Sequence, residues 1–363
     1  MDNENILISG ASIAGPALAY WLTRYGFRPT VVERTPALRE GGYKLDIRGK
    51  AVEVVERMGI LADIRQVSTG MKEGTFVDRN GKAVVSMSAE FFNSRQEQDD
   101  EVMRTDLSRI IYERTRSDVE YLFNDSITSI TEGQNGVAVT FERGKPRVFD
   151  LVIGADGIHS NVRRLVFGDE SRFLHNLGAY ISIFTAPNFL DLDRQELYYY
   201  APGKFVSLFS AQDRSKAMSF FFFSSPPLSH DYRNIEQQKG LLTSFFSGDG
   251  WQIPRLLKDV WDAPDFYFDS VSQIHMDRWS AGRIALLGDA AYCPSPASGQ
   301  GTSLALIGAY VLAGELALAS GDYTTAFTRK RQKAPGFSQG DRWRRKPAAA
   351  GRPPSLDRRQ SLC

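Results

Sequence analysis

The alternation of apolar and polar residues at the start of the chain predicts a strand, a tight turn, a helix and a second strand. The apolar run 5–8 forms the first strand, and the segment 10–15, bounded by glycines, forms the turn. Residues 16–22 are typical of a helix, and the apolar run 29–32 makes a strand that ends at Glu33. Such a βαβ unit requires a parallel sheet covered by helices.

The same α/β pattern returns later in the chain. Residues 50–65 carry apolar side chains at helical spacing, and Asp106 is placed to cap another helix. Residues 151–156 and 283–289 are continuous apolar runs, which are typical of buried parallel strands. The second run leads through a Pro/Gly/Ser loop into a helix at 302–318. These segments belong with the first βαβ unit in one Rossmann-like domain.

Two other segments have a different pattern. The segment 74–101 contains Asn80-Gly81, a strong hairpin signal between alternating residues, and 172–267 is rich in Phe and Tyr with few helical patterns before about 235. We therefore expect an α/β fold, α+β overall, with a mostly antiparallel sheet inserted as a substrate domain. The predicted boundaries are 1–73, 102–171 and 268–328 for the Rossmann-like domain, and 74–101 and 172–267 for the substrate domain.

Composition agrees with two packed domains, because 363 residues exceed the roughly 250–300 that usually share one core. With 42% hydrophobic and 24% charged residues the chain has the balance of a soluble globular protein. No run approaches the roughly 18 apolar residues of a membrane span and no signal peptide opens the chain, so we expect a cytoplasmic protein. Two cysteines without a CxxC pair and four scattered histidines argue against a disulfide scaffold and a metal site.

The charge is unevenly distributed. Residues 329–363 carry eleven Lys/Arg against two Asp/Glu, and since the whole chain is +1, the first 328 residues carry −8. The segment 329–363 contains four prolines and no apolar periodicity, so it cannot offset its ordering entropy, and we expect a disordered tail. It resembles a frame-shifted end, and a nucleic-acid-binding arm is the alternative. The net charge gives no indication of a nucleic-acid partner.

The segment Gly10-Ala11-Ser12-Ile13-Ala14-Gly15 is a variant of the dinucleotide-binding fingerprint. Its first Gly permits the tight turn, its last Gly lets the helix approach the sheet, and the helix start faces a pyrophosphate. Glu33 follows Gly10 by 23 residues, and a carboxylate there accepts hydrogen bonds from a ribose and repels a 2′-phosphate, which favours resident FAD or NAD. The alternatives are a Gly-rich turn without function and a solvated charge at a strand end.

Two later motifs distinguish FAD from NAD. The segments 153–163, with Asp156, and 283–291, with Gly288-Asp289, resemble the DG and GD motifs of the class A flavoprotein monooxygenases. The resemblance covers about residues 1–325 and implies bound FAD. Asp289, at the carboxyl edge of the sheet, can accept hydrogen bonds from the ribityl chain, and the helix start after 294–301 can stabilise the negative charge of reduced flavin. A Gly-Asp pair that only caps the next helix is the alternative.

The resemblance also implies that Arg104 and Asp46 contact FAD. No protein acid or base is expected: His159 is interpreted as structural and Cys293 as a packing residue. No metal ligand is expected either. The residues expected to bind FAD are Gly10, Ser12, Ala14, Gly15, Glu33, Arg34, Arg39, Asp46, Arg48, Arg104, Asp156, Gly288, Asp289, Pro296, Gly299, Gly301 and Thr302.

Within this family, the segments 42–49, 186–190 and 288–296 resemble the tetracycline destructases. The resemblance implies a monomeric monooxygenase that uses NADPH or NADH and O₂ to hydroxylate a polycyclic aromatic substrate, a tetracycline, through a flavin C4a-hydroperoxide. One dinucleotide fold is visible, so the nicotinamide cofactor would bind transiently. The alternatives are a hydroxylase of aromatic polyketides or phenols, an FAD-dependent reductase or dehydrogenase, an NAD-dependent dehydrogenase and a non-catalytic flavin-binding protein.

Overall fold

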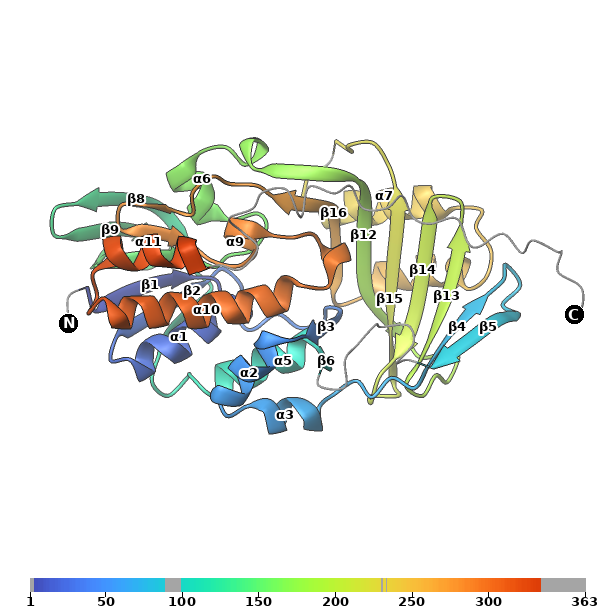
Figure 1. Cartoon of the computed structure of the whole chain (residues 1–363). Coiled ribbons are helices and arrows are strands. Elements are labelled where there is room, and N and C mark those ends of the chain that lie inside the picture. Colours follow the sequence, from blue (N-terminus) through green and yellow to red (C-terminus); the bar gives the residue numbers. More distant parts are fainter. Residues whose placement is uncertain (1–2, 89–98, 230, 233, 334–363) are drawn as a thin grey trace, which may run out of the picture.

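The computed structural model describes residues 3–88, 99–229, 231–232 and 234–333. The chain forms two parts that lie side by side (Figure 1). The first part contains segments from both ends of the described chain, drawn in blue and in orange to red, and the large yellow-green sheet belongs to the second. The second part is therefore inserted into the first along the sequence, which confirms the predicted fold class.

A six-stranded sheet in the order β17-β18-β11-β1-β2-β7 forms the centre of the first part. All neighbours are parallel except β17, which is antiparallel to β18. Both faces are covered, so the central strands are continuous apolar runs, and residues 6–8 and 151–153 are fully buried. The strands are β1 Asn5–Ser9, β2 Arg28–Glu33, β7 Glu120–Phe123, β11 Leu151–Gly154, β17 Ser280–Ala281 and β18 Ile284–Leu286.

Helices cover one face of this sheet, and a small sheet covers the other. Helix α10 lies between α1 and α11, and the rings of Trp21 and Tyr310 join α1 to α10 with centroids 4.8 Å apart. Val137 and Val139, from the three-stranded antiparallel sheet, complete the same core. The elements are α1 Ala14–Arg24, α2 Lys50–Arg57, α3 Leu61–Gln66, α5 Arg104–Glu113, β8 Ile127–Gly133, β9 Gly136–Phe141, β10 Arg147–Phe149, α6 Asn161–Phe167, α9 Asp289–Tyr292, α10 Gly301–Leu318 and α11 Tyr323–Lys333, with short 3-10 turns at Glu170–Arg172 and Pro296–Ser298.

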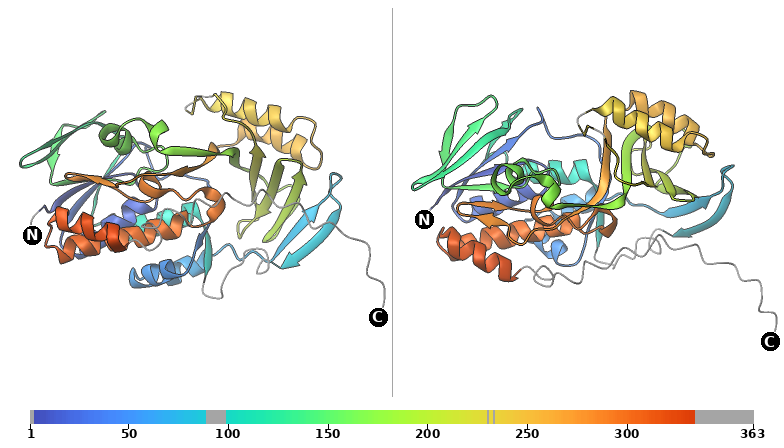
Figure 2. Two further views of the ribbon diagram at one scale, coloured as in Figure 1. Left: turned by 45° about the horizontal axis from the view of Figure 1, so that its top comes forward. Right: turned by 90° about the horizontal axis from the view of Figure 1, so that it is seen from above.

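The second part is a seven-stranded sheet in the order β16-β12-β15-β14-β13-β4-β5, antiparallel except between β13 and β4. Two helices cover one face (Figure 2), where Phe221 and Phe223 are buried in a second core. Because side chains alternate along a strand, Phe220 and Phe222 lie on the other face. The elements are β4 Glu73–Val77, β5 Ala83–Ser88, β12 Leu174–Pro187, β13 Gln195–Ala201, β14 Lys204–Ser210, β15 Lys216–Ser224, α7 Ile235–Phe246, α8 Ile253–Asp262 and β16 Phe266–Ile274.

Several local expectations need correction. The helix predicted at 50–65 is two helices, α2 and α3, because Gly59 has a φ of +71° and interrupts the helical backbone between them. Helix α5 begins at Arg104, so Asp106 lies in its first turn, where its charge suits the helix dipole, and does not cap it. The strand β16, which belongs to the large sheet, extends across the predicted boundary between 267 and 268. The hairpin predicted around Asn80-Gly81 is confirmed as β4 and β5.

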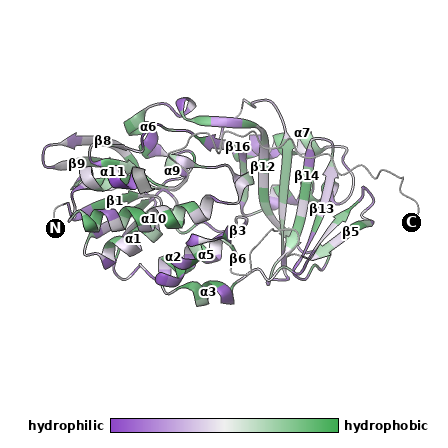
Figure 3. Cartoon of the chain, in the orientation of Figure 1, coloured by the Kyte–Doolittle hydropathy of each residue, from purple (hydrophilic) through white to green (hydrophobic). Residues whose placement is uncertain are grey.

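One helix among the described residues, α10, is long and apolar enough by length and composition to cross a membrane, contrary to our expectation that no segment approaches that size. Figure 3 shows mostly hydrophobic residues along it. Half of the helix is buried, and it packs between α1 and α11. A helix in the core of a globular domain meets the same two criteria, so α10 is weak support for a membrane span.

The prediction of a disordered tail from residue 329 is wrong for the first part of that segment. Helix α11 continues to Lys333, which makes the first five residues of the expected tail helical. The helix packs against the first part of the molecule because Ala326 and Phe327, on its inner side, are buried in the first core. The predicted disorder of 334–363, together with Cys363, lies outside the described residues.

A buried ion cluster joins the two parts. Lys44, on β3 (Lys44–Ile47), pairs with Glu196 of β13 and lies 3.7 Å from Glu101 of β6 (Asp100–Met103), the strand with which β3 pairs. The three side chains are 8%, 2% and 3% exposed. Desolvation alone would lower the pKa of Lys44, but the two carboxylates outweigh it and raise that pKa. The cluster thus fixes β3 against the large sheet through charges that are costly to separate.

Candidate functional site

The turn between β1 and α1 brings the chain very close to itself. Gly10 has a φ of +107°, and a Cβ on it would lie 2.5 Å from the carbonyl oxygen of Ala155. A Cβ on Gly15 would lie 1.9 Å from the carbonyl oxygen of Gly10. Only glycine fits at both positions. Helix α1 starts here without a side-chain cap, so its first N–H groups are free to bind an anion.

Glu33 fixes the second strand to this turn. Its Oε2 accepts a hydrogen bond of 2.9 Å from the N–H of Ala11, and its Oε1 accepts two bonds of 3.0 Å from the N–H and hydroxyl of Thr35. The residue is only 9% exposed. Oε1 thus has both of its acceptor positions filled, whereas Oε2 keeps capacity for a further donor, such as a ribose hydroxyl. The structure therefore places Glu33 beside the Gly-rich turn, where the sequence predicted it.

Arg104 lies on the other side of the turn. Its guanidinium donates to Ser12 Oγ over 3.3 Å and to the carbonyl of Gly41 over 3.0 Å. Desolvation and the charge of Arg34 lower the pKa of Arg39, and desolvation and the charge of Arg39 lower the pKa of Arg104. Within the described residues, none of these three arginines forms an ion pair with a carboxylate. The turn is therefore bordered by cations whose charge is not neutralised, which suits a pyrophosphate.

The Gly288-Asp289 pair lies where α1 and α10 begin. A Cβ on Gly288 would come within 3.3 Å of the Cβ of Ala14, a tight contact, and 3.7 Å of that of Ala305, an ordinary one, so a side chain here would press against the start of α1. Asp289 Oδ1 lies 3.6 Å from the place of a Cβ on Gly301. Burial raises the pKa of Asp289, and no cation among the described residues pairs with it. Its carboxylate is thus available to ligand hydroxyl groups.

The loop that follows packs against β3. Gly299 has a left-handed backbone, and a Cβ there would lie 3.4 Å from Asp46 Oδ2. The N–H of Arg48 donates to Ser303 Oγ over 3.0 Å, and its guanidinium donates to Asp46 over 2.7 Å. Ser295 adopts a φ of +87°, a strained conformation for a residue with a side chain. These contacts hold Asp46, Arg48 and the uncapped start of α10 together.

Other residues that were predicted to bind FAD lie near this site, but their side chains differ in exposure and in hydrogen bonding. Asp156 accepts hydrogen bonds from Ser9 Oγ, Ser160 Oγ and the N–H of Val162, at 3.3, 2.5 and 3.1 Å. Its carboxylate is therefore used within the protein, where it fixes the start of α6, and its contact with FAD stays a prediction. The side chains of Arg34, Arg39 and Pro296 are exposed, and Thr302 is buried in the first turn of α10.

His159 lies between two carboxylates. Its Nδ1 is 2.9 Å from Glu170 Oε1 and its Nε2 is 3.0 Å from Asp269 Oδ2. Desolvation would lower its pKa, but these two partners raise it to about 10. An imidazolium that ties the first part to β16 is a structural element, which agrees with our interpretation. Cys293 is buried, as expected for a packing residue. No group of three or more possible metal ligands occurs in the described parts of the chain.

Tyr267 is a candidate that sequence reasoning missed. Its hydroxyl donates to Asp269 Oδ2 over 3.0 Å, and burial together with the charge of Asp269 raises the pKa of Tyr267, which keeps the side chain neutral. Although 41% exposed, Tyr267 lies where β16 meets the candidate site, within electrostatic reach of Arg104 and Asp289. The sequence did contain a signal for this residue. Tyr267 lies between Phe266 and Phe268, and because side chains alternate along a strand, it lies on the opposite face from these two rings.

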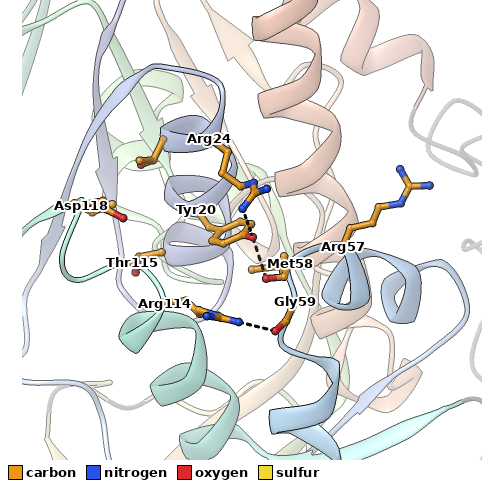
Figure 4. Close-up of a pocket in the computed structure, with 10 residues that line it drawn as sticks. Tyr20, Arg24, Arg57, Met58, Gly59, Arg114, Thr115 and Asp118 are labelled. Atoms are coloured by element: carbon orange, nitrogen blue, oxygen red, sulfur yellow. Dashed lines mark hydrogen bonds between the residues drawn. The ribbon is translucent and has the colours of Figure 1, made fainter.

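A cavity of about 420 Å³ lies at the opposite ends of the helices that build this site. Figure 4 shows Arg24 pointing toward the Tyr20 hydroxyl and Arg114 toward the carbonyl of Gly59, while Arg57 points away. These arginines stand at the ends of α1, α2 and α5, where free carbonyl groups carry partial negative charge. Helix-end electrostatics account for them, and this cavity is not the place of the predicted flavin contacts.

Comparison with known proteins decides what this arrangement is. Residues 3–322 match a family described as FAD binding domain. The chain belongs to this family. It is 45% identical over 327 residues to a flavin-dependent monooxygenase of Legionella longbeachae, covering 90% of this chain and 84% of the relative. It is also 47% identical over 342 residues to uncharacterized protein Rv1260 of Mycobacterium tuberculosis, covering 94% and 92%.

Solved structures give the same result. The crystal structure of tetracycline destructase Tet(51) has a TM-score of 0.84 and 41% identity and covers 90% of this chain and 85% of that one. The structure of tetracycline destructase Tet(55) has a TM-score of 0.82 and 43% identity and covers 91% and 85%. The resemblance to class A flavin monooxygenases is confirmed. This chain is therefore an FAD-dependent monooxygenase, an enzyme that uses O₂ and a small-molecule substrate.

The ion pairs of His159 predict a pH dependence of stability. A folded-state pKa of about 10, above the ordinary 6.5, means that the stabilisation is fully present below about pH 6.5 and is lost as the pH rises through about 10. His159→Gln should lower the free energy of unfolding by about 1–2 kcal/mol at low pH, with allowance for partial exposure, and have little effect at high pH. Urea unfolding of both proteins below about pH 6.5 and above about pH 10 measures this difference in the free energy of unfolding. The exposed His175→Gln is the control, and an equal loss for His159→Gln at both pH values would contradict the assignment.

Proposed function

We propose that this monooxygenase uses NADPH or NADH to hydroxylate a polycyclic aromatic substrate, with tetracyclines as the first choice. The observation that supports this proposal is a continuous row of aromatic rings on the sheet face opposite α7 and α8. Ring centroids follow one another from Tyr43 to Phe220 at 4.9 Å, to Phe205 at 5.8 Å, to Tyr200 at 4.6 Å and to Phe76 at 5.5 Å.

This row begins beside the candidate flavin site. Tyr43 directly precedes β3. This strand carries Asp46 and packs against the loop before α10. Tyr200, further along the row, is 59% exposed. A flat, partly exposed apolar wall that starts at the flavin site suits a fused-ring molecule, because offset stacking of rings adds to the burial of apolar area. A single-ring phenol would use only part of this wall.

The residues of the site fit FAD. The turn 10–15 and Glu33 would hold the adenosine half, Arg104 the pyrophosphate and Asp289 the ribityl chain. The uncapped start of α10 would face the pyrimidine edge of the ring, where its partial positive charge favours the reduced, anionic form. When bound, FAD supplies the electron transfer from the nicotinamide, the activation of O₂ and the transfer of oxygen.

The tasks left to the protein are binding, orientation and exclusion of water. Substrate lying on the aromatic row would displace water from the flavin edge, which protects a reactive oxygen species from wasteful breakdown. We assign no protein acid or base to the chemistry. The described chain has one Gly-rich dinucleotide turn, and this turn is assigned to FAD, so NADPH or NADH would bind transiently at a surface shared with the flavin.

Asp289 offers a test of the flavin assignment. Asp289→Ala removes a charge-assisted hydrogen bond of about 1.5–3 kcal/mol and should weaken FAD binding about 10- to 100-fold, while the far-ultraviolet circular dichroism stays that of the parent. Titration of the stripped protein with FAD measures the affinity. Asp277→Ala, which removes an exposed acid outside the site, should bind FAD like the parent. Equal affinity of the two variants would remove Asp289 from the site.

The substrate is tested by the fate of oxygen. Tetracycline should accelerate NADPH oxidation by the FAD-loaded enzyme, and its product should gain one oxygen atom from ¹⁸O₂. A product without the label would indicate a reductase or dehydrogenase, and unchanged NADPH oxidation would indicate a different substrate or a non-catalytic flavin protein. A simple phenol and an aromatic polyketide serve as comparison substrates. Faster turnover of the phenol than of tetracycline would contradict the polycyclic assignment.

A further inference from the structure

A second cavity, of about 150 Å³, lies between β17, β18 and α11. The rings of Trp279 and Phe327 form part of its wall, and Arg278, Ser280 and Lys330 supply polar groups. None of the residues that line it belongs to the candidate flavin site. The cavity therefore has no part in the function proposed above, and its chemistry has to be explained separately.

Lys330 is the unusual member of this cavity. The residue is only 5% exposed, and its Nζ donates a hydrogen bond of 3.0 Å to the main-chain carbonyl of Leu286. The Tyr292 ring lies 6.0 Å from Nζ, and no described carboxylate pairs with the ammonium group. Desolvation lowers the pKa of Lys330 to about 7. The neutral amine is therefore much more populated at pH 7 than it is for an ordinary lysine.

A neutral amine with a single hydrogen bond to a carbonyl keeps its lone pair for chemistry. Two donors in the same cavity complement it, because neither the guanidinium of Arg278 nor the hydroxyl of Ser280 has a hydrogen-bond partner among the described residues. The site thus combines a nucleophilic nitrogen with groups that would bind an anion formed on it. If only packing were needed here, a buried Met would serve without the cost of desolvating an ammonium group.

We propose that Lys330 is a carbamylation site, at which dissolved CO₂ adds to the side-chain amine and Arg278 and Ser280 bind the resulting carboxylate. The nitrogen lone pair forms the N–C bond, one C=O bond pair moves onto oxygen, and one amine proton leaves to solvent. The sum is amine plus CO₂ giving carbamate plus a proton, without oxidation or reduction. The co-reactant is CO₂ in equilibrium with bicarbonate.

The hydrogen bond to Leu286 favours CO₂ over a carbonyl compound. A carbamate nitrogen keeps one N–H, which can go on donating to the carbonyl of Leu286, whereas a neutral imine has none and would leave this buried acceptor unsatisfied. The size of the cavity also favours CO₂. The added group has three heavy atoms, and a cavity of about 150 Å³ holds it with room for water. Arg278 lines the same cavity, so its guanidinium would serve as the counter-ion of the new negative charge.

The test uses the full chain, loaded with FAD and equilibrated with ¹³C-bicarbonate at about pH 8. Trapping with a trialkyloxonium salt, followed by peptide mass spectrometry, should find the labelled carbamate on Lys330. Lys50, whose side chain is 78% exposed, should remain unlabelled. Lys330→Arg should abolish the label, and Arg278→Gln should reduce the labelled fraction at Lys330 at least about 10-fold with unchanged flavin content.

Each outcome decides the proposal, and none depends on turnover of a substrate. Absence of label at Lys330 in the folded, flavin-loaded protein would overturn it. Equal labelling of Lys50 and Lys330 would show unselective chemistry and would also overturn it. Label at Lys330 that is unaffected in Arg278→Gln would refute the role of the guanidinium, and since that variant keeps Lys330, the result does not depend on whether Lys330→Arg folds.

Discussion

The close approach of Gly15 to the carbonyl of Gly10 is the constraint on which the rest of the site depends. Because neither residue has a Cβ, α1 starts directly against the end of β1, and its free N–H groups face one point. The same closeness lets Ala11 donate to Glu33, and it leaves Ala14 in contact with Gly288. The starts of α1 and α10 therefore converge from segments almost 290 residues apart in sequence.

Electrostatics follow from this arrangement. The helices α1, α2 and α5 begin at the candidate site and end at arginines on the far side, so their dipoles have the same direction and their positive ends are directed at this site. The first 328 residues carry −8, yet Arg34, Arg39 and Arg104 gather at the turn. The cluster of Lys44 fixes β3 between this charged site and the aromatic face. The candidate cofactor site and the aromatic face are thus positioned by the same strand.

Local sequence patterns predicted the βαβ unit, Glu33 and the two flavin motifs, because glycine geometry and strand periodicity act over a few residues. The contacts that complete the site could not be predicted in this way. Arg48 meets Ser303 across 255 positions, and Lys44 meets Glu196 across 152, so both depend on how the two parts pack. The motif likewise gave no sign that Ser9, Ser160 and the N–H of Val162 donate to Asp156, because these partners have no sequence pattern of their own.

The most direct test of the account is the flavin content of the purified protein, measured from its visible absorption spectrum. We expect one FAD per chain in the parent and almost none in Glu33→Lys. The substitution places an ammonium group where a buried carboxylate accepts a hydrogen bond from the N–H of Ala11. The exposed Glu142→Lys should keep its flavin. A folded Glu33→Lys protein that is as yellow as the parent would contradict the assignment of this turn to FAD.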